Sequence, residues 1–377
     1  MKGKDVLEKR FIQTSESREN NLDILRFFLA CVVIHSHSYM LTGHEYFSLR
    51  QKFIHLQFGG GSYAVDFFFM LSGFLVVNSW LRSRGLFDYL KRRTLRIYPG
   101  FIVCLALCVF VAGPLGGADL KSYFQSGQTY TFFRPLILGP LGTLPGVFTN
   151  APWPGEVNVP LWTIRFEFLC YLFLAAIGMA GLLRKRTIVL GLFIAAAVFF
   201  TIQKHGQAEL TVYEIPLFGA VEQIPRFVAF FLAGVAFYLY RDVIPQSGLL
   251  ALVSLFGIAV ATALHAFEPG LTIFGTYLIF YTGFHPKVHC HHFAKHGDFS
   301  YGMYLYGFVA QQLLVRHVAF ARHPLQLTAL ALCAALTMAF LSWHLVEKPF
   351  LKLKRKSAAP REKVPMNSPE AAQAVLA

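Results

Sequence analysis

Long apolar stretches separated by short polar or charged segments run along almost the whole chain. Each stretch approaches the ~20 apolar residues that cross a bilayer, so the pattern predicts about ten membrane-spanning helices. The predicted spans cover residues 22–41, 63–81, 96–113, 158–181, 187–203, 225–240, 247–266, 270–284, 299–316 and 325–346. The fold class that follows is an all-α polytopic membrane protein.

Composition favours a membrane protein over a soluble one. Of the 377 residues, 55% are hydrophobic and 14% are charged, and the mean hydropathy is +0.50. We therefore predict a membrane domain at 22–352, a cytoplasmic N-terminal tail at 1–21 and a disordered cytoplasmic tail at 353–377, which is polar and rich in Ala and Pro.

The lysines and arginines lie mainly on one side of this layout. With the N-terminus inside, 24 of the 34 basic residues fall on the inner side and 7 on the outer side. The positive-inside rule then places both termini in the cytoplasm. It also argues against nucleic acid as a partner, because orientation and anionic membrane lipids account for the net charge of +14.

The first predicted span, LRFFLACVVIHSH, carries three ionisable side chains: Arg26, His35 and His37. At about 100° per residue, Arg26 and His37 share one helix face, about 16 Å apart along the axis, whereas His35 faces the opposite way. Ionisable groups within a span usually face a cavity lined by protein or water. His37 is therefore the functional candidate, with a hydrogen-bonded packing role as its alternative, and His35 is interpreted as a packing residue.

The next two spans add further candidates. In YAVDFFFMLSGF, Asp66 needs a partner, while Ser72 and Gly73 lie mid-span and favour close helix packing. In RTLRIYPG, Arg93 and Arg96 are placed on the first turn of the third span, three residues apart and on one face. Such a pair suits a phosphate group, with an ordinary membrane anchor as the alternative.

Charged residues also occur in later spans. Arg165 and Glu167, in LWTIRFEF, are two residues apart, so they point in different directions and each needs a partner on another helix. Glu347 lies near the inner end of the tenth span. The histidine-rich segment HPKVHCHHFAKH, which includes His291, shows no paired ligand spacing. We interpret it as a solvated loop and predict no metal site.

Taken in order, these segments resemble acyltransferase family 3, integral membrane proteins that acylate envelope and secreted glycans. LDILRFFLACVVIHSH is similar to the family's pattern of Arg, ten residues and His; RTLRIYP to its Arg-x-x-Arg pair; and LWTIRFEF to its Trp-to-Glu segment. VDFFFMLSGFL, SYGMYLY and VEKPF resemble further motifs, so the resemblance covers about 20–352. The matching residues are Arg26, His37, Arg93, Arg96, Trp162 and Glu167. Many members carry a histidine where this chain has Gly307, so the role of that histidine does not carry over.

The resemblance implies a membrane O-acyltransferase. Such an enzyme moves an acyl group, acetyl by default, from cytoplasmic acyl-CoA to a carbohydrate hydroxyl on the extracytoplasmic side. Acyl-CoA would be a co-substrate rather than a bound cofactor, and an envelope or secreted glycan would be the acceptor. The surroundings would be membrane lipids, in the cell membrane and by default the bacterial inner membrane.

Residue roles follow from the same resemblance. Arg26, Arg93 and Arg96 would hold the phosphates of CoA near the inner surface. Farther out, His37 would act as general base on the sugar hydroxyl, with Glu167 as first choice to orient its ring. Whether His37 instead carries the acyl group as an acyl-imidazole stays open. Supporting roles are expected for Asp66, which is the second choice to orient His37, and for Ser72, Trp162 and Glu347.

The alternative from another class is a secondary transporter or flippase of a glycan or lipid-linked sugar, with the intramembrane His, Arg and Glu as a proton relay. The chain has no obvious internal repeat of the kind many transporters contain, which weighs against this reading. Consumption of acetyl-CoA by the purified protein separates the two. A non-catalytic envelope scaffold is a third reading, and it predicts that replacing His37 leaves function intact.

Overall fold

The structure is a computed structural model that describes Phe11 and residues 20–44, 60–205, 214–215, 219–290 and 292–353. The predicted tails at 1–21 and 353–377 therefore lie almost entirely outside the described residues. Within the described residues, the secondary structure is helical apart from one antiparallel pair of two-residue strands, β1 (Glu214–Ile215) and β2 (Gly219–Ala220).

Helices account for the rest of the secondary structure. The α-helices are α2 (Leu22–Leu41), α4 (Gly60–Leu81), α5 (Leu86–Leu107), α6 (Gly113–Leu115), α7 (Leu120–Gln125), α8 (Gly127–Tyr130), α9 (Ile164–Met179), α10 (Arg186–His205), α11 (Ile224–Tyr240), α12 (Gly248–Ala263), α13 (Phe267–Gly270), α14 (Thr276–Gly283), α15 (Ser300–His317), α16 (Pro324–Ser342) and α17 (Lys348–Lys352). Short π-helical turns at Cys108–Ala112, Leu271–Gly275 and Trp343–Glu347 join some of them into longer rods. Short 3₁₀ turns lie at Thr131–Ile137, Val159–Thr163, Leu182–Arg184, Val221–Gln223, Phe293–His296 and Ala319–Arg322.

Six helical segments among the described residues are long and apolar enough to cross a membrane. They are Leu22–Leu41, Gly60–Leu81, Leu86–Leu115, Val159–Met179, Arg186–Gln203 and Pro324–Lys352. The prediction of an all-helical membrane protein is thus confirmed in its main point. The count of about ten spans and the cytoplasmic position of both termini stay predictions.

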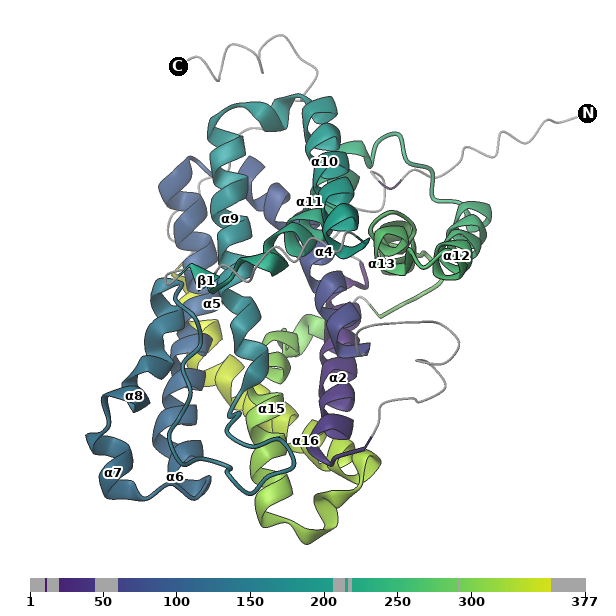
Figure 1. Cartoon of the computed structure of the whole chain (residues 1–377). Helices are drawn as coiled ribbons and strands as arrows, with labels where there is room; N and C mark the ends of the chain where they lie inside the picture. Colours follow the sequence, from purple (N-terminus) through teal and green to yellow (C-terminus); the bar gives the residue numbers. More distant parts are fainter. Residues whose placement is uncertain are drawn as a thin grey trace, which may run out of the picture.

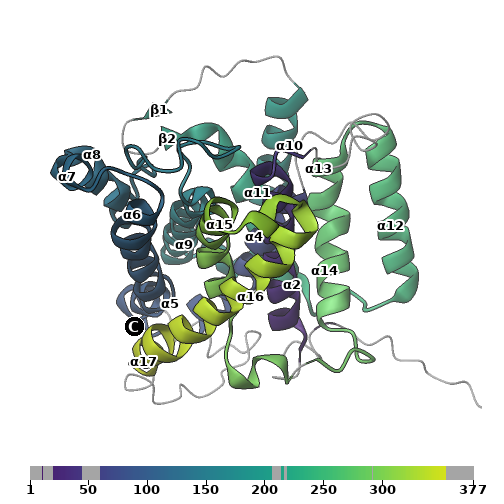
Figure 2. The ribbon, with the colours of Figure 1, turned by 90° about the horizontal axis from the view of Figure 1, so that it is seen from below.

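Helix α4 occupies the centre of the bundle, where it contacts α2, α9, α11 and α14 (Figure 1). Helix α15 packs against α2, α5 and α16. In the view from below, α12 and α14 lie at one edge of the bundle and α6, α7 and α8 lie at the opposite edge (Figure 2). The residues of α2, α4, α5, α9 and α15 therefore surround one interior region.

Two glycines let α4 and α11 approach each other closely. A Cβ atom at Gly73 would lie 2.0 Å from the carbonyl oxygen of Phe231, and a Cβ atom at Gly234 would lie 1.9 Å from that of Met70. Both distances are far inside van der Waals contact with backbone atoms, which cannot move aside as a flexible side chain can. The close approach agrees with the packing role predicted for the small residues in the middle of this span.

Replacing Gly73 with alanine should therefore destabilise the folded protein by about 1–3 kcal/mol or more, the usual cost of overpacking a core. Its matched control is Gly191→Ala on α10, where an added Cβ meets no atom within 4 Å. Both variants are compared with the parent by the fraction of detergent-solubilised protein that stays monodisperse after heating. A Gly73→Ala protein as heat-resistant as the control would contradict the close contact.

The third predicted span begins earlier than expected. Helix α5 starts at Leu86 rather than near Arg96, because the charged segment is itself helical and is stabilised by an ion pair of 2.9 Å between Asp88 and Arg92, one turn apart. Arg93 and Arg96 therefore lie about two and three turns inside the helix. The prediction that they lie on its first turn is wrong, and the helix dipole cannot assist them there.

Candidate active site

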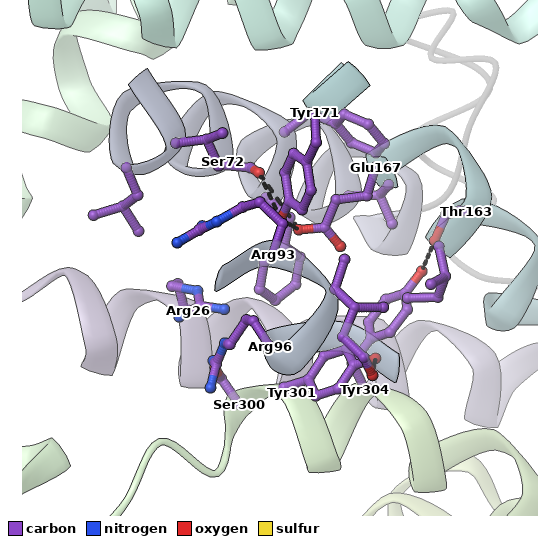
Figure 3. Close-up of a pocket in the computed structure, with 17 residues that line it drawn as sticks. Arg26, Ser72, Arg93, Arg96, Thr163, Glu167, Tyr171, Ser300, Tyr301 and Tyr304 are labelled. Carbon is purple, nitrogen blue, oxygen red and sulfur yellow. Dashed lines mark hydrogen bonds between the residues drawn. The ribbon is translucent and has the colours of Figure 1, made fainter. Parts of the chain in front are cut away.

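A pocket with about 810 Å³ of empty space, part of it open to solvent, lies between α2, α4, α5, α9 and α15 (Figure 3). Its polar and aromatic lining includes Arg26, Ser72, Arg93, Arg96, Thr163, Glu167, Tyr171, Ser300, Tyr301 and Tyr304. The pocket thus brings together the three predicted donor-binding arginines with Ser72 and Glu167.

Arg26 and Arg96, from two different helices, meet at one carboxylate. Nη1 of Arg26 lies 2.7 Å from Oδ2 of Asp298, and Nη2 of Arg96 donates to the same oxygen. Nη1 of Arg96 also lies 3.9 Å from Oε2 of Glu347. Asp298 precedes α15, outside the membrane-spanning helices. Burial alone raises the pKa of Asp298, but Arg26 and Arg96 outweigh it and hold that pKa below its usual range, so the carboxylate is ionised at neutral pH.

Arg93 differs from the other two arginines. Its Nη2 donates to the hydroxyl of Ser79 at 3.0 Å, and its guanidinium carbon lies 5.7 Å from the centre of the Tyr171 ring. In the described parts of the chain, its Nε is buried without a hydrogen-bond partner and no carboxylate pairs with it. Arg93 therefore presents a guanidinium that, among the described residues, contacts the neutral side chains of Ser79 and Tyr171.

Glu167 is held by hydroxyl groups from two helices. Tyr171, one turn along α9, donates to Oε1 of Glu167, and Ser72 of α4 donates to the same oxygen at 3.4 Å (Figure 3). From the sequence, Glu167 was predicted to lie farther out than the arginines. It instead lines the same pocket, since the arginines lie deeper in α5 than predicted and Glu167 is in the first turn of α9, after the 3₁₀ turn Val159–Thr163.

His37 lies beyond the end of this pocket. Its ring packs edge-on against Phe308, with 5.1 Å between the ring centres, and it is not a lining residue. Phe308 shares one face of α15 with the lining residues Tyr301 and Tyr304, about one helical turn farther along. Among the described residues, no hydrogen bond joins His37 to Glu167, so the predicted orienting contact between them is not formed in this structure.

The two histidines of α2 face different neighbours, as the helical spacing predicted. Nδ1 of His35 lies 3.2 Å from the hydroxyl of Thr328 on α16, and its ring packs against Tyr39. His37 faces α15 instead, at Phe308. A packing role for His35 agrees with its contacts.

Asp66 serves a different purpose from the one considered for it. It is fully buried, and its two carboxylate oxygens accept from Nε and Nη2 of Arg226 at 2.9 Å each, which ties α4 to α11. Asp66 does not line the pocket. Its expected role as second choice to orient His37 is therefore replaced by an interhelical ion pair, whose partner Arg226 can be identified only once α4 and α11 are known to be neighbours.

Trp162 and Glu347, the remaining expected residues, do not line the pocket but contact other side chains. The Trp162 ring packs against Phe166 and Phe227, with ring centres 5.5 and 5.6 Å apart. Oε1 of Glu347 accepts from the hydroxyl of Ser342 at 3.0 Å.

Several residues of the pocket, above all Asp298, were not predicted from the sequence. Two arginines in apolar spans imply a buried carboxylate partner, and that rule, applied to the residues preceding SYGMYLY, would have pointed to Asp298. Tyr304 was missed as well, and its hydroxyl lies 2.6 Å from that of Thr163. Tyr301 donates to the carbonyl oxygen of Ile97 at 2.8 Å. Both tyrosines lie in a motif that was recognised only as a whole.

The histidine-rich segment does not assemble a metal site in the residues described. Within them, no group of three or more His, Cys, Asp or Glu side chains is arranged to hold a metal ion. His291 lies outside the described residues.

Comparison with known proteins gives one family and two relatives. The profile of a family described as "Acyltransferase domain" matches residues 19–347. An O-acetyl transferase of Shigella phage Sf6 is 26% identical over 345 residues, which cover 89% of this chain and 96% of the relative. Nodulation protein 10 of Rhizobium leguminosarum bv. viciae is 29% identical over 173 residues, covering 42% of this chain and 44% of the relative. No solved structure matches the chain.

Proposed function

This chain belongs to acyltransferase family 3, and from that premise we propose that it moves an acetyl group from cytoplasmic acetyl-CoA to a carbohydrate hydroxyl on the extracytoplasmic side of the membrane. Family membership makes it an enzyme that transfers acyl groups, which decides against a transporter or flippase. Acetyl is proposed because the relative from Shigella phage Sf6 is an O-acetyl transferase. The acceptor, an envelope or secreted glycan, is proposed from the motifs.

The observation that supports this proposal best is the grouping of three arginines from two helices at one pocket beside the carboxylate of Glu167. CoA carries phosphate groups at one end and a thioester at the end of a long pantetheine arm. Arginines suit the phosphates because their guanidinium groups bind phosphate oxygens bidentately. The pantetheine arm would then run along the pocket, where Glu167 can accept hydrogen bonds from its amide N–H groups.

The proposed chemistry takes place at His37. About 16 Å of helix α2 separates Arg26 from His37, and both lie on one helix face, so an arm anchored by its phosphates can extend toward the imidazole. His37 takes the proton of the sugar hydroxyl as the oxygen attacks the thioester carbonyl carbon. The carbon–sulfur bond then breaks, and the imidazolium returns the proton to the CoA thiolate. A thiol is a good leaving group, so activation of the hydroxyl is the demanding step.

The test uses purified protein in lipid vesicles. With acetyl-CoA and acceptor glycan both present, a thiol reagent should register release of free CoA, and mass spectrometry should find acetylated glycan. The same glycan from a deletion strain should lack the acetyl ester that the parent strain carries. A parent and a deletion strain with identical glycans, together with no CoA release, would overturn the proposed function.

The proposed binding of acyl-CoA from the cytoplasmic side of the membrane leads to a labelling prediction. The distribution of basic residues places Ser83, in the turn between α4 and α5, inside, and Ser48, outside the described residues, on the opposite side. In a chain whose native cysteines are replaced, including the exposed Cys333, an impermeant maleimide should label a cysteine at Ser48 in intact cells. A cysteine at Ser83 should react only after the membrane is broken. The reverse pattern would rule out cytoplasmic acyl-CoA as the donor.

A further inference from the structure

Asp298 contacts three of the helices that surround the pocket. Its Oδ1 accepts from the backbone N–H of Ser300 at 3.2 Å and from the Ser300 hydroxyl, at the start of α15. Its Oδ2 accepts from Arg26 of α2 at 2.7 Å and from Arg96 of α5. One oxygen is thus fixed by the end of a helix, and the other holds two arginines that are far apart in the sequence.

These contacts are nearly closed to solvent. The side chains of Arg26, Arg96 and Asp298 are 18%, 17% and 14% exposed, and Arg26, Arg96 and Ser300 line the pocket. Two guanidinium groups at one oxygen repel each other, so they can stay adjacent in this low-dielectric setting only with a carboxylate between them. The bonds to Ser300 hold that carboxylate in place independently of the arginines.

We propose that Asp298 is a positioning residue for the donor: it fixes the guanidinium groups of Arg26 and Arg96 at the pocket wall, ready to receive the phosphate groups of acyl-CoA. This rests on the proposed function. Long arginine side chains lose much conformational freedom when they bind a ligand. A site that orders them before the ligand arrives avoids that cost at binding, so it gains affinity without a new contact to the ligand. Arg93, which no described carboxylate neutralises, completes the proposed phosphate site.

The inference predicts a specific kinetic defect. Asp298→Asn keeps the size of the side chain but removes the charge that holds the two arginines. It should raise the KM for acetyl-CoA, and the Kd for CoA measured by calorimetry, by about tenfold or more, the size expected for a lost charge-assisted contact. The kcat at saturating donor should stay within about threefold. Asp298→Glu keeps the charge and should recover part of the affinity.

The matched control is Asp88→Asn. Asp88 also pairs with an arginine, Arg92, but within α5 alone, and neither residue lines the pocket. Its KM for acetyl-CoA should stay within about twofold of the parent value. A purely structural role for Asp298 would lower the melting temperature and the active fraction while leaving KM unchanged, and that result would overturn the inference.

Three further outcomes are decisive. If Asp298→Asn does not accumulate, Ser300→Ala keeps every charge and removes one donor to Oδ1, and it should still raise the KM for acetyl-CoA about threefold; an unchanged KM there overturns the inference. If the parent protein neither binds CoA nor consumes acetyl-CoA, the proposed function itself fails and takes this inference with it. An active parent with a parental KM in Asp298→Asn overturns the role of Asp298 alone.

Discussion

Replacing His37 with alanine should reduce acyl transfer at least about 100-fold, because general-base catalysis typically contributes 10²–10⁴-fold. The imidazole shares a helix face with Arg26 and packs against Phe308, which lies about one helical turn along α15 from the lining residue Tyr304. The protein should still insert in the membrane at normal abundance, since in the described part of the chain His37 packs edge-on against Phe308 and forms no ion pair. The measurement is the acetyl content of the glycan, normalised to the amount of protein.

The control for His37 lies two residues away. His35→Ala should keep most of the activity, because His35 contacts Thr328 and Tyr39 on the opposite side of the helix. Equal loss of glycan acetylation in both variants, at equal abundance, would contradict the assignment of His37. Unchanged activity in His37→Ala would favour a reaction carried out entirely by the residues of the pocket.

Arg93→Ala should raise the KM for acetyl-CoA by about 10- to 100-fold, more than it affects the KM for the acceptor, as expected for loss of a hydrogen-bonded charge at a phosphate. Its Nη2 contacts only the neutral hydroxyl of Ser79, and among the described residues no carboxylate competes for its charge. Lysine at this position should restore part of the affinity, because it supplies the charge without the bidentate geometry.

The neighbouring arginine supplies the control for Arg93. Arg92 is on the same helix and also carries a positive charge, but it pairs with Asp88 and does not line the pocket. Arg92→Ala should leave the KM for acetyl-CoA nearly unchanged. If calorimetry finds the same affinity for CoA in folded Arg93→Ala as in the parent, Arg93 is a membrane anchor and not a donor ligand.

The local pattern of apolar and polar residues was sufficient to predict the long helical segments and to predict which residues share a face of one helix. Apolar length predicted the long segments, because a bilayer requires about 20 consecutive apolar residues whatever the neighbouring helices are. The 3.6-residue period separated His37 from His35, and their different contacts with Phe308 and Thr328 agree. The start of α5 was misplaced since a charged but helix-forming segment carries no apolar signal, although its Asp88–Arg92 pair stabilises the helix.

By itself, the sequence determined a helical membrane protein of acyltransferase family 3 and the residues that one helix presents on one face. Only the tertiary structure decided which helices are neighbours, and that choice sets the partners of the charged side chains that pair between segments far apart in the chain. It assigned Asp66 to Arg226, Glu167 to Ser72, and the pair of Arg26 and Arg96 to Asp298. The physical reason is that a charge in an apolar bundle requires a partner within a few ångströms, and helices far apart in the chain supply that partner.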